Sequence, residues 1–408
     1  MSGGIDRRAA LIGGVSALGG AALAAGCRRA GPAAARSDAG RVLVLVELMG
    51  GNDGLSMLVP KRDDRYYAAR PRTAIPPERT LDLDGDVGLH PALQWLRARY
   101  DRGEVAFVEG TGYPEPIYSH FRAFEVWHTA RMEGRGSGDG WIGRLREHLW
   151  ADDPRSEVLV HVGGEIPYSL ACSARPALGF RAPDSLQWFG PARGGLALER
   201  AAELGDPQDG GSALLAEIRS RLKHAQSASA RVVDACASYR PRAEYPATDF
   251  GGELRAVAAL LRTDLGTRVF SLTLGNFDTH GGTQPALYQR LFTTLDQGLE
   301  AFLRDLEGSE AAERVLVVCF SEFGRRVDEN FSGGTDHGAA GPMILLGKPV
   351  RGGLYGARPS LAELDQDGNL VHTVDFRRVY ASVLERWFGA DVAGVLGRSW
   401  EPLPLLRA

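Results

Sequence analysis

Val42-Leu43-Val44-Leu45-Val46 is the stretch that decides the fold class. An apolar run this short and this rich in β-branched residues is typical of a strand buried on both faces of a parallel sheet. The pattern recurs at 105–108, 269–274, 315–320 and 343–346. Helical patterns lie between or after these runs, at 91–102, 120–130, 212–236, 253–262, 285–306 and 376–388. We therefore predict an α/β fold with a mostly parallel central sheet and helices on both faces.

The composition is that of a globular protein. Of the 408 residues, 44% are apolar and 24% are charged, and the formal net charge is −4. Acids and bases are interspersed, without the basic stripe that a nucleic-acid-binding protein needs, so we expect no nucleic acid among the partners. Stretches rich in Gly, Pro and polar residues predict surface loops at 135–140 and 190–211.

The first 35 residues differ from the rest. Arg7 and Arg8 precede an uncharged Ala/Gly/Leu run at 9–25, a pattern typical of a twin-arginine export signal. The run is shorter than the ~20 apolar residues that a membrane-spanning helix needs. We predict a signal at 1–35 that is read by the twin-arginine export machinery, and one α/β domain at 36–408. The mature protein would then be periplasmic or anchored to the envelope.

The end of the signal has two interpretations. The sequence before Cys27 is that of a lipoprotein cleavage site, in which Cys27 would carry a lipid anchor, whereas 33–35 offers an ordinary small-residue cleavage site. Both stay open. The remaining thiols, Cys172, Cys236 and Cys319, can form at most one intramolecular disulfide, so this is no disulfide-rich scaffold. Cys319 lies in an apolar run and is expected in the core.

Four glycine-rich loops carry the chemistry. Three follow strands and hold Asp53, then Asp278 with His280, then Glu322 with Arg325; the fourth, at 333–338, precedes the last strand and holds Asp336 and His337. Ligands gather at the carboxyl ends of strands in α/β sheets. The alternative is that each loop is a structural Asx turn.

The residue types in these loops predict one divalent ion. Asp53, Asp278, His280, Glu322 and His337 are the candidate ligands, with Asp336 as an additional one. The candidate ions are zinc, manganese and calcium: mixed carboxylate and imidazole ligation suits zinc, manganese or another divalent ion, while calcium prefers more oxygen. Asp278 and His280 lie two residues apart, so both face the same side of an extended segment.

Ser119 is the candidate nucleophile. It precedes the helical pattern that begins at His120, where a serine is most often an N-cap. The same position offers the positive helix end to an oxyanion or phosphate, and a nearby metal could activate the hydroxyl. Arg325 could neutralise oxygens of a phosphoryl or sulfuryl group, or could be paired within the protein. Among other histidines, His128 is expected to be packed, His161 to be on the surface, and His372 to be an outside candidate for a ligand.

These segments together resemble the bacterial family named domain of unknown function 1501, which is similar to the alkaline phosphatase and sulfatase superfamily. The matching stretches are 47–60, 89–93, 110–121, 139–144, 277–282, 320–325, 333–347 and 373–387. The resemblance implies an alkaline-phosphatase-like fold with Ser119 in the nucleophile position. It also implies that Asp53 is the first ligand, Asp278 and His280 the middle pair, Glu322 the replacement of an Asp, and His337 the late histidine.

Three departures limit what the resemblance implies. Phe323 stands where the superfamily has a histidine after the fourth ligand, which favours one ion over two unless Asp336-His337 fills the gap. Asp278 and His280 are closer together than the usual pair. Ser119 lacks the proline-containing signature for conversion to formylglycine, so a typical sulfatase is not expected.

The sequence leaves three functions open. The first is an exported hydrolase of phosphate or sulfate esters, on a small molecule or a polymer, with Ser119 as nucleophile. The second is a protein without catalysis that binds an envelope polymer or a partner protein. The third is a metal-dependent mutase or transferase that passes the group through Ser119.

Overall fold

The computed structural model describes residues 40–186, 213–263 and 265–407. Arg7, Arg8 and Cys27, the boundary after residue 35 and the loop expected at 190–211 lie outside these residues, so the corresponding expectations remain predictions. Among the described residues, no helix is long and apolar enough to cross a membrane.

The centre of the fold is a nine-stranded sheet in the order β13-β5-β12-β9-β1-β8-β6-β7, with β14 also paired to β5. Its strands are β1 (Val42–Leu48), β5 (Val105–Gly112), β6 (Leu159–Val162), β7 (Leu178–Phe180), β8 (Val269–Leu274), β9 (Val315–Phe320), β12 (Gly341–Leu346), β13 (Gly353–Tyr355) and β14 (Val374–Asp375). The strands expected at 269–274 and 315–320 are confirmed to the residue.

One strand of this described sheet runs against the others. β12 pairs antiparallel with both β5 and β9, whereas β9, β1, β8, β6 and β7 are parallel to one another. The predicted α/β fold with a mostly parallel sheet is therefore confirmed. Because β12 is reversed, the loop that precedes it reaches the same edge as the loops that follow β1, β8 and β9.

The buried runs of the sequence explain the layers. Every residue of β1 is buried. Val44 and Val46 face one apolar core, and Leu43 and Leu45 face the other. A strand with apolar side chains on both faces must be covered on both faces. Cys319 is buried in β9, as expected from the sequence.

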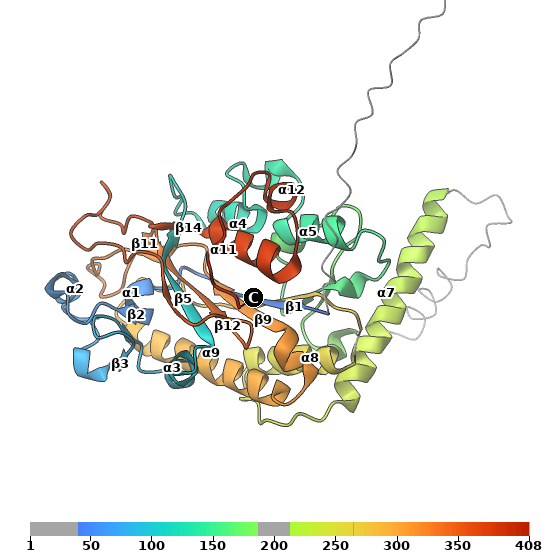
Figure 1. Cartoon of the computed structure of the whole chain (residues 1–408), viewed down its shortest axis with the longest axis horizontal. Helices are drawn as coiled ribbons and strands as arrows, with labels where there is room; N and C mark the ends of the chain where they lie inside the picture. The colour runs from blue at the N-terminus through green and yellow to red at the C-terminus, as the bar shows by residue number, and fades with distance from the viewer. Residues whose placement is uncertain (1–39, 187–212, 264, 408) are drawn as a thin grey trace, which may run out of the picture. The chain divides into compact units, whose positions relative to one another are not determined.

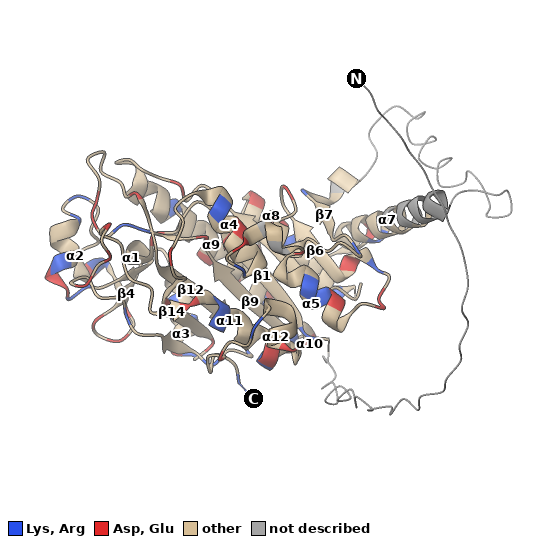
Figure 2. Cartoon of the chain, turned by 90° about the horizontal axis from the view of Figure 1, so that it is seen from above, with Lys and Arg blue, Asp and Glu red and all other residues tan. Residues whose placement is uncertain are grey.

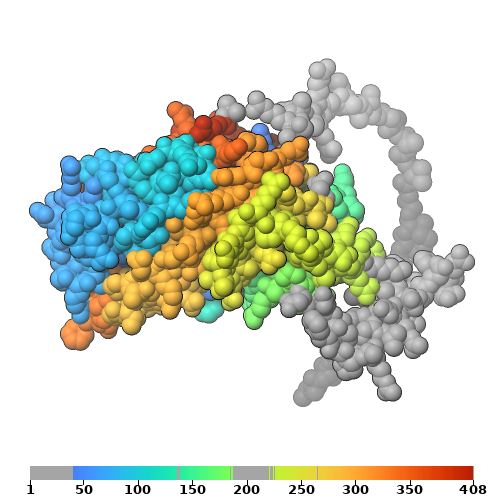
Figure 3. All heavy atoms as spheres, turned by 90° about the horizontal axis from the view of Figure 1, so that it is seen from below, coloured from blue at the N-terminus to red at the C-terminus, as the bar shows by residue number. Residues whose placement is uncertain are grey.

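Helices form the two outer layers, which Figure 1 shows above and below the sheet. The core on the side of Val44 is closed by α3 (Gln94–Asp101), α7 (Ala213–Ser238), α8 (Asp249–Arg262), α9 (Gln284–Leu306) and α10 (Glu310–Arg314). In Figure 3 this face is formed largely by the orange and yellow helices, with the blue segment beside them. The core on the side of Leu43 is closed by α4 (His120–Thr129), α5 (Trp141–Leu149), α11 (Phe376–Ser382) and α12 (Val392–Leu396).

Smaller elements complete the domain. These are α1 (Gly54–Met57), α2 (Asp64–Ala69), the sheet of β2 (Leu58–Val59), β3 (Leu81–Asp82) and β4 (Gly88–Leu89), and the hairpin of β10 (Gly324–Arg325) and β11 (His337–Gly338). The helix expected at 376–388 is divided into α11 and a π-helical segment, η7 (Val383–Phe388). The loop expected at 135–140 overlaps a 3-10 turn, η2 (Gly134–Ser137). Basic and acidic residues are interspersed along the described chain (Figure 2).

Candidate metal centre

The candidate site lies where four loops meet at the carboxyl edge of the sheet. The loops after β1 and β8 pack so closely that a Cβ added at Gly50 would lie 2.4 Å from the backbone nitrogen of Asp278. Gly50 also has a φ of +119°, a conformation that glycine adopts readily. The β10–β11 hairpin pairs Arg325 with His337. The glycines of the motif thus allow the close approach that brings the polar side chains together.

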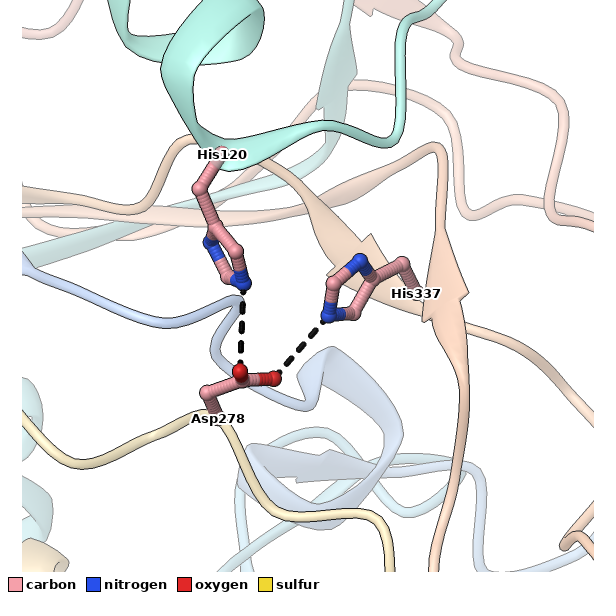
Figure 4. A group of neighbouring side chains, drawn as sticks. All are labelled: His120, Asp278 and His337. Atoms are coloured by element: carbon pink, nitrogen blue, oxygen red, sulfur yellow. Dashed lines mark hydrogen bonds and ion pairs between the residues drawn. The ribbon is translucent and has the colours of Figure 1, made fainter.

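Three imidazoles converge on one carboxylate, and we call His120, Asp278, His280 and His337 the histidine–aspartate cluster. Nε2 of His280 lies 2.8 Å and Nε2 of His337 lies 2.9 Å from Oδ1 of Asp278, and the two nitrogens are 3.1 Å apart. Nε2 of His120 lies 3.3 Å from Oδ2 of Asp278. Figure 4 shows His120, at the start of α4, and His337, on β11, both pointing at Asp278.

The other ring nitrogen of each histidine faces a protein acceptor. Nδ1 of His120 lies 2.7 Å from Oε1 of Glu322. Nδ1 of His280 lies 3.2 Å from Oδ1 of Asp336, and Nδ1 of His337 lies 2.8 Å from the carbonyl of Tyr118. Ionised carboxylates and carbonyls only accept hydrogen bonds, so each of these acceptors can hold an imidazole proton on Nδ1. A histidine that ligates a metal through Nε2 has an acceptor of this kind behind its Nδ1.

The donor set fits a divalent ion. Oδ1 of Asp278 and the Nε2 atoms of His280 and His337 form a triangle with edges of 2.8, 2.9 and 3.1 Å. Donors on one face of a tetrahedral zinc with bonds of about 2.0–2.1 Å are about 3.3 Å apart, close to these edges. Nε2 of His120 is buried and, apart from its approach to Oδ2 of Asp278, has no hydrogen-bond partner among the described residues. His120, Asp278 and His337 together form a group of ligand atoms that could hold an ion.

Asp278 is held ionised. Burial raises the pKa of its carboxyl, but the hydrogen bonds from His337 and Arg325 and the charge of Arg325 outweigh burial and bring the pKa well below its usual range. The side chains of Asp278 and His280 are 46% and 43% exposed, so an ion or a substrate can reach them from solvent.

Arg325 is buried beneath the cluster. Its Nε donates to the carbonyl of Gly51, Nη1 to that of Thr335 and Nη2 to that of Phe277, over 2.8, 2.9 and 3.0 Å. Nη2 also lies 3.0 Å from Oδ1 of Asp278. Its N–H groups thus connect the loops. This agrees with the second of the two roles that the sequence left open for Arg325, pairing within the protein.

Asp53 lies apart from the cluster. Its carboxylate is fully buried, forms an ion pair with Arg70 and accepts hydrogen bonds from Ser56 and the backbone of Leu55. Glu322 is also buried, and it binds His120 and the backbone N–H of Gly50. Glu322 therefore contacts the histidine–aspartate cluster only from behind, at the Nδ1 atom of His120 that faces away from Asp278.

Ser119 is the exposed N-cap of α4, and its side chain makes no capping hydrogen bond. Both of its chain neighbours contact the cluster, His120 through its ring and Tyr118 through its carbonyl. The ten-residue helix α4 therefore begins at the cluster.

Sequence reasoning missed His120. The feature of the sequence that could have indicated this ligand is the position of His120, directly after Ser119 at the start of a predicted helix. In the structure its ring lies beside the loop that follows β9. Phe323 follows Glu322 where the resemblance led us to expect a histidine. The imidazole of His120 lies beside Glu322 instead, and the ring centroids of His120 and Phe323 are 4.9 Å apart. His161, expected on the surface, is fully buried, so that expectation was wrong: it faces Ser271 of the neighbouring strand.

Residues 199–396 match the family described as Protein of unknown function (DUF1501). The matched stretch is just under half of the chain. The resemblance inferred from the motifs is thereby confirmed. No curated protein sequence matches the chain.

Several solved structures are similar in fold to this chain. A protein in the superfamily from Vibrio parahaemolyticus is 10% identical with a TM-score of 0.38, covering 88% of this chain and 69% of that one. The C-terminal periplasmic domain of EcEptC from Escherichia coli, in complex with Zn, is 11% identical with a TM-score of 0.34, covering 75% and 72%. The lipoteichoic acid synthase LtaP from Listeria monocytogenes is 8% identical with a TM-score of 0.35, covering 78% and 66%.

Proposed function

We propose that this DUF1501 protein is a metal-dependent hydrolase of phosphate or sulfate esters that acts outside the cytoplasm. The observation that supports it most is the convergence of three imidazole Nε2 atoms on Asp278, each with an acceptor behind its Nδ1. Histidines that ligate one ion converge on one point and have a hydrogen-bond acceptor behind their other ring nitrogen.

His120, Asp278 and His337 are the proposed ligands, with His280 as the fourth. This set keeps Asp278, His280 and His337 from the sequence prediction and adds His120. Glu322 and Asp336 orient His120 and His280, and Asp53 is placed in the supporting framework. A bound zinc or manganese ion would polarise the ester and lower the pKa of a coordinated hydroxyl.

Ser119 is the proposed nucleophile. Its hydroxyl is exposed and makes no capping bond, and it directly precedes a cluster residue. The first N–H groups of α4 have no partners within the helix, so they can hold the oxygens of a phosphoryl or sulfuryl group. Arg325 is a positioning residue in this proposal, because its N–H groups already bind protein carbonyls.

The first test is the metal content of the purified mature protein by elemental analysis. We expect about one equivalent of zinc or manganese in the wild type, and less than a tenth of that in Asp278→Asn and His337→Ala. His148→Ala, an exposed histidine on α5, is the matched control and should retain the metal. A metal-free wild type after dialysis against both ions contradicts the proposal.

The second test separates chemistry from binding. Ser119→Ala should keep the metal and lose at least about 100-fold in kcat on any phosphate or sulfate ester that the wild type hydrolyses. Product analysis with an added acceptor alcohol detects the transferase variant of the same chemistry. Unchanged turnover in Ser119→Ala excludes Ser119 as the nucleophile.

Export is tested separately. Arg7→Lys with Arg8→Lys should retain the precursor in the cytoplasm, and labelling with a radioactive fatty acid distinguishes lipidated Cys27 from cleavage near residue 35. Export unaffected by the double change would refute the twin-arginine route.

A protein without catalysis is the second candidate. The observation that favours it is the Arg70–Asp53 ion pair, which places a buried cation where the superfamily resemblance implies a metal ligand. In that case the metal would be bound, no ester in a broad phosphate and sulfate screen would be hydrolysed, and Ser119→Ala would change nothing.

A further inference from the structure

A large cavity lies beside the cluster, at the carboxyl ends of β1, β8 and β6. Its volume is about 1410 Å³, whereas sites for small ligands usually measure about 300–1,000 Å³. Glu47, Phe124, His128, Gly163 and Glu253 are among the residues that line it. Ligands of open α/β sheets bind in this position, outside the carboxyl ends of the strands.

One face of α4 connects the cluster to the cavity. The ring of Phe124 lies 6.1 Å from the ring of His120 and 5.6 Å from that of His128. His128 in turn binds Glu47 through Nε2 and Oε1, over 2.8 Å, with both side chains only 7% exposed. A ligand whose ester group lies at His120 can therefore extend along this face into the cavity.

Two buried polar atoms without partners among the described residues lie next to Gly163, on the side of the cavity formed by β6 and α8. They are Nε2 of His161, whose side chain is fully buried, and Oε2 of Glu253. A Cβ added at Gly163 would lie 3.3 Å from Nε2 of His161 and 3.4 Å from Oε1 of Glu253. Gly163 lines the cavity, so its missing side chain leaves a small space between the two groups. Unpartnered buried polar groups are costly, and a ligand that hydrogen-bonds to them recovers this cost.

We infer that this cavity binds an uncharged, polyhydroxylated group such as a sugar ring, which forms the alcohol part of the ester. The position of the ester group at His120 rests on the proposed function, whereas binding in the cavity does not depend on it. A hydroxyl both donates and accepts, so one ligand can donate to Glu47 and accept from Arg181 or the imidazole of His161. The lining carries carboxylates and arginines together, including Asp249 and Arg255, so it does not select one sign of charge.

The state of Glu253 agrees with an uncharged ligand. Burial raises the pKa of its carboxyl to about 8, with the charge of Asp249 adding to the effect. The wall beside Gly163 thus disfavours a charge, and a protonated Glu253 can donate a hydrogen bond as well as accept one.

The test measures binding directly, without turnover. The purified mature protein is titrated in a calorimeter with neutral tetrasaccharides, namely cellotetraose, maltotetraose and chitotetraose. We expect at least one to bind, and Glu253→Leu to weaken its Kd at least tenfold, while Glu253→Gln keeps part of the affinity. Gly163→Ala should also weaken it, by filling the space between His161 and Glu253. Glu310→Gln, an exposed change on α10, is the control for substitution of a glutamate.

The outcomes separate the inference from the proposed function. Saccharide binding that survives Asp278→Asn, while metal is lost, supports the cavity whether or not an ester is hydrolysed. Ester turnover without saccharide binding overturns the inference and leaves the hydrolase standing. Binding that is equal in the wild type and Glu253→Leu also overturns it.

Discussion

Arg70 and Asp53 form an ion pair in which both side chains are fully buried, with Nη1 of Arg70 2.5 Å from Oδ2 of Asp53. Burial raises the pKa of the Asp53 carboxyl, but the charge and hydrogen bonds of Arg70 outweigh it and keep the pKa below its ordinary value. Arg70 also donates to the carbonyls of Arg326 and Val327. The pair thus ties the segment after β1 to the segment after β10, beneath the cluster.

Arg70→Met should destabilise the protein strongly, because it leaves the buried charge of Asp53 without a partner. We expect a loss of about 3–5 kcal/mol in the free energy of unfolding. The double variant Arg70→Met, Asp53→Asn should be more stable than Arg70→Met alone, since the charge is then gone. Urea unfolding monitored by tryptophan fluorescence measures all three proteins. A loss under 1 kcal/mol in Arg70→Met would show that water or another cation replaces the arginine.

Glu322→Gln should weaken metal binding without removing a proposed ligand. The amide can present its NH₂ group in place of an oxygen, so the hydrogen bond that Nδ1 of His120 donates is lost or reversed in direction. Loss of such an outer partner costs about 10–100-fold in metal affinity. Competition with a coloured chelator measures the affinity. Equal affinities in Glu322→Gln and wild type would mean that His120 is not a ligand or needs no orientation.

Gly50→Ala should disturb the site through the backbone. The new Cβ would meet the backbone of Asp278 at 2.4 Å and would occupy a φ of +119°. Gly281→Ala is the matched control, because no atom lies within 4 Å of its added Cβ. We expect Gly50→Ala to lose metal and at least about 2 kcal/mol of stability, with Gly281→Ala close to wild type. Equal metal content in both variants would refute the close packing of these loops as a requirement.

The strands of the central sheet were predictable from the sequence, but the direction of each strand was not. Short runs dominated by apolar residues located β8 and β9 to the residue, since a strand buried on both faces has few polar positions. The reversal of β12 left no trace in its own residues, because an apolar strand looks the same in both directions. That reversal is what carries His337 to the edge where Asp278 lies.

The site was predictable in its loops and less so in its contacts. Glycine next to Asp or His marked the loops around Asp278 and His337, which do meet. The partners of Asp53 and Glu322 are Arg70 and His120, which lie 17 and 202 residues away from them and outside the glycine-rich loops. Long-range pairing of this kind is decided by how the layers pack, and no local pattern records it.

Asp296 is a buried acid whose contribution to stability should fall as pH rises. Its carboxylate, on α9, accepts from the backbone N–H groups of Trp95 and Leu96 and so caps α3, whose own N-cap residue, Leu93, has no acceptor. Burial raises the pKa of Asp296 to about 6 in spite of these bonds, from an ordinary value of 3.8. Between these two values the native state binds the proton more readily than the unfolded state.

The free energy of unfolding should therefore rise as pH falls from 7 to 4, relative to Asp296→Asn, which cannot titrate. At about 1.4 kcal/mol per pKa unit, the difference between wild type and variant should change by roughly 3 kcal/mol over this interval. Urea unfolding at pH 4, 5, 6 and 7 measures it, with the exposed change Asp152→Asn as the control. A difference that is constant with pH would show that the two N–H bonds hold Asp296 ionised, because charge-assisted bonds would then outweigh burial.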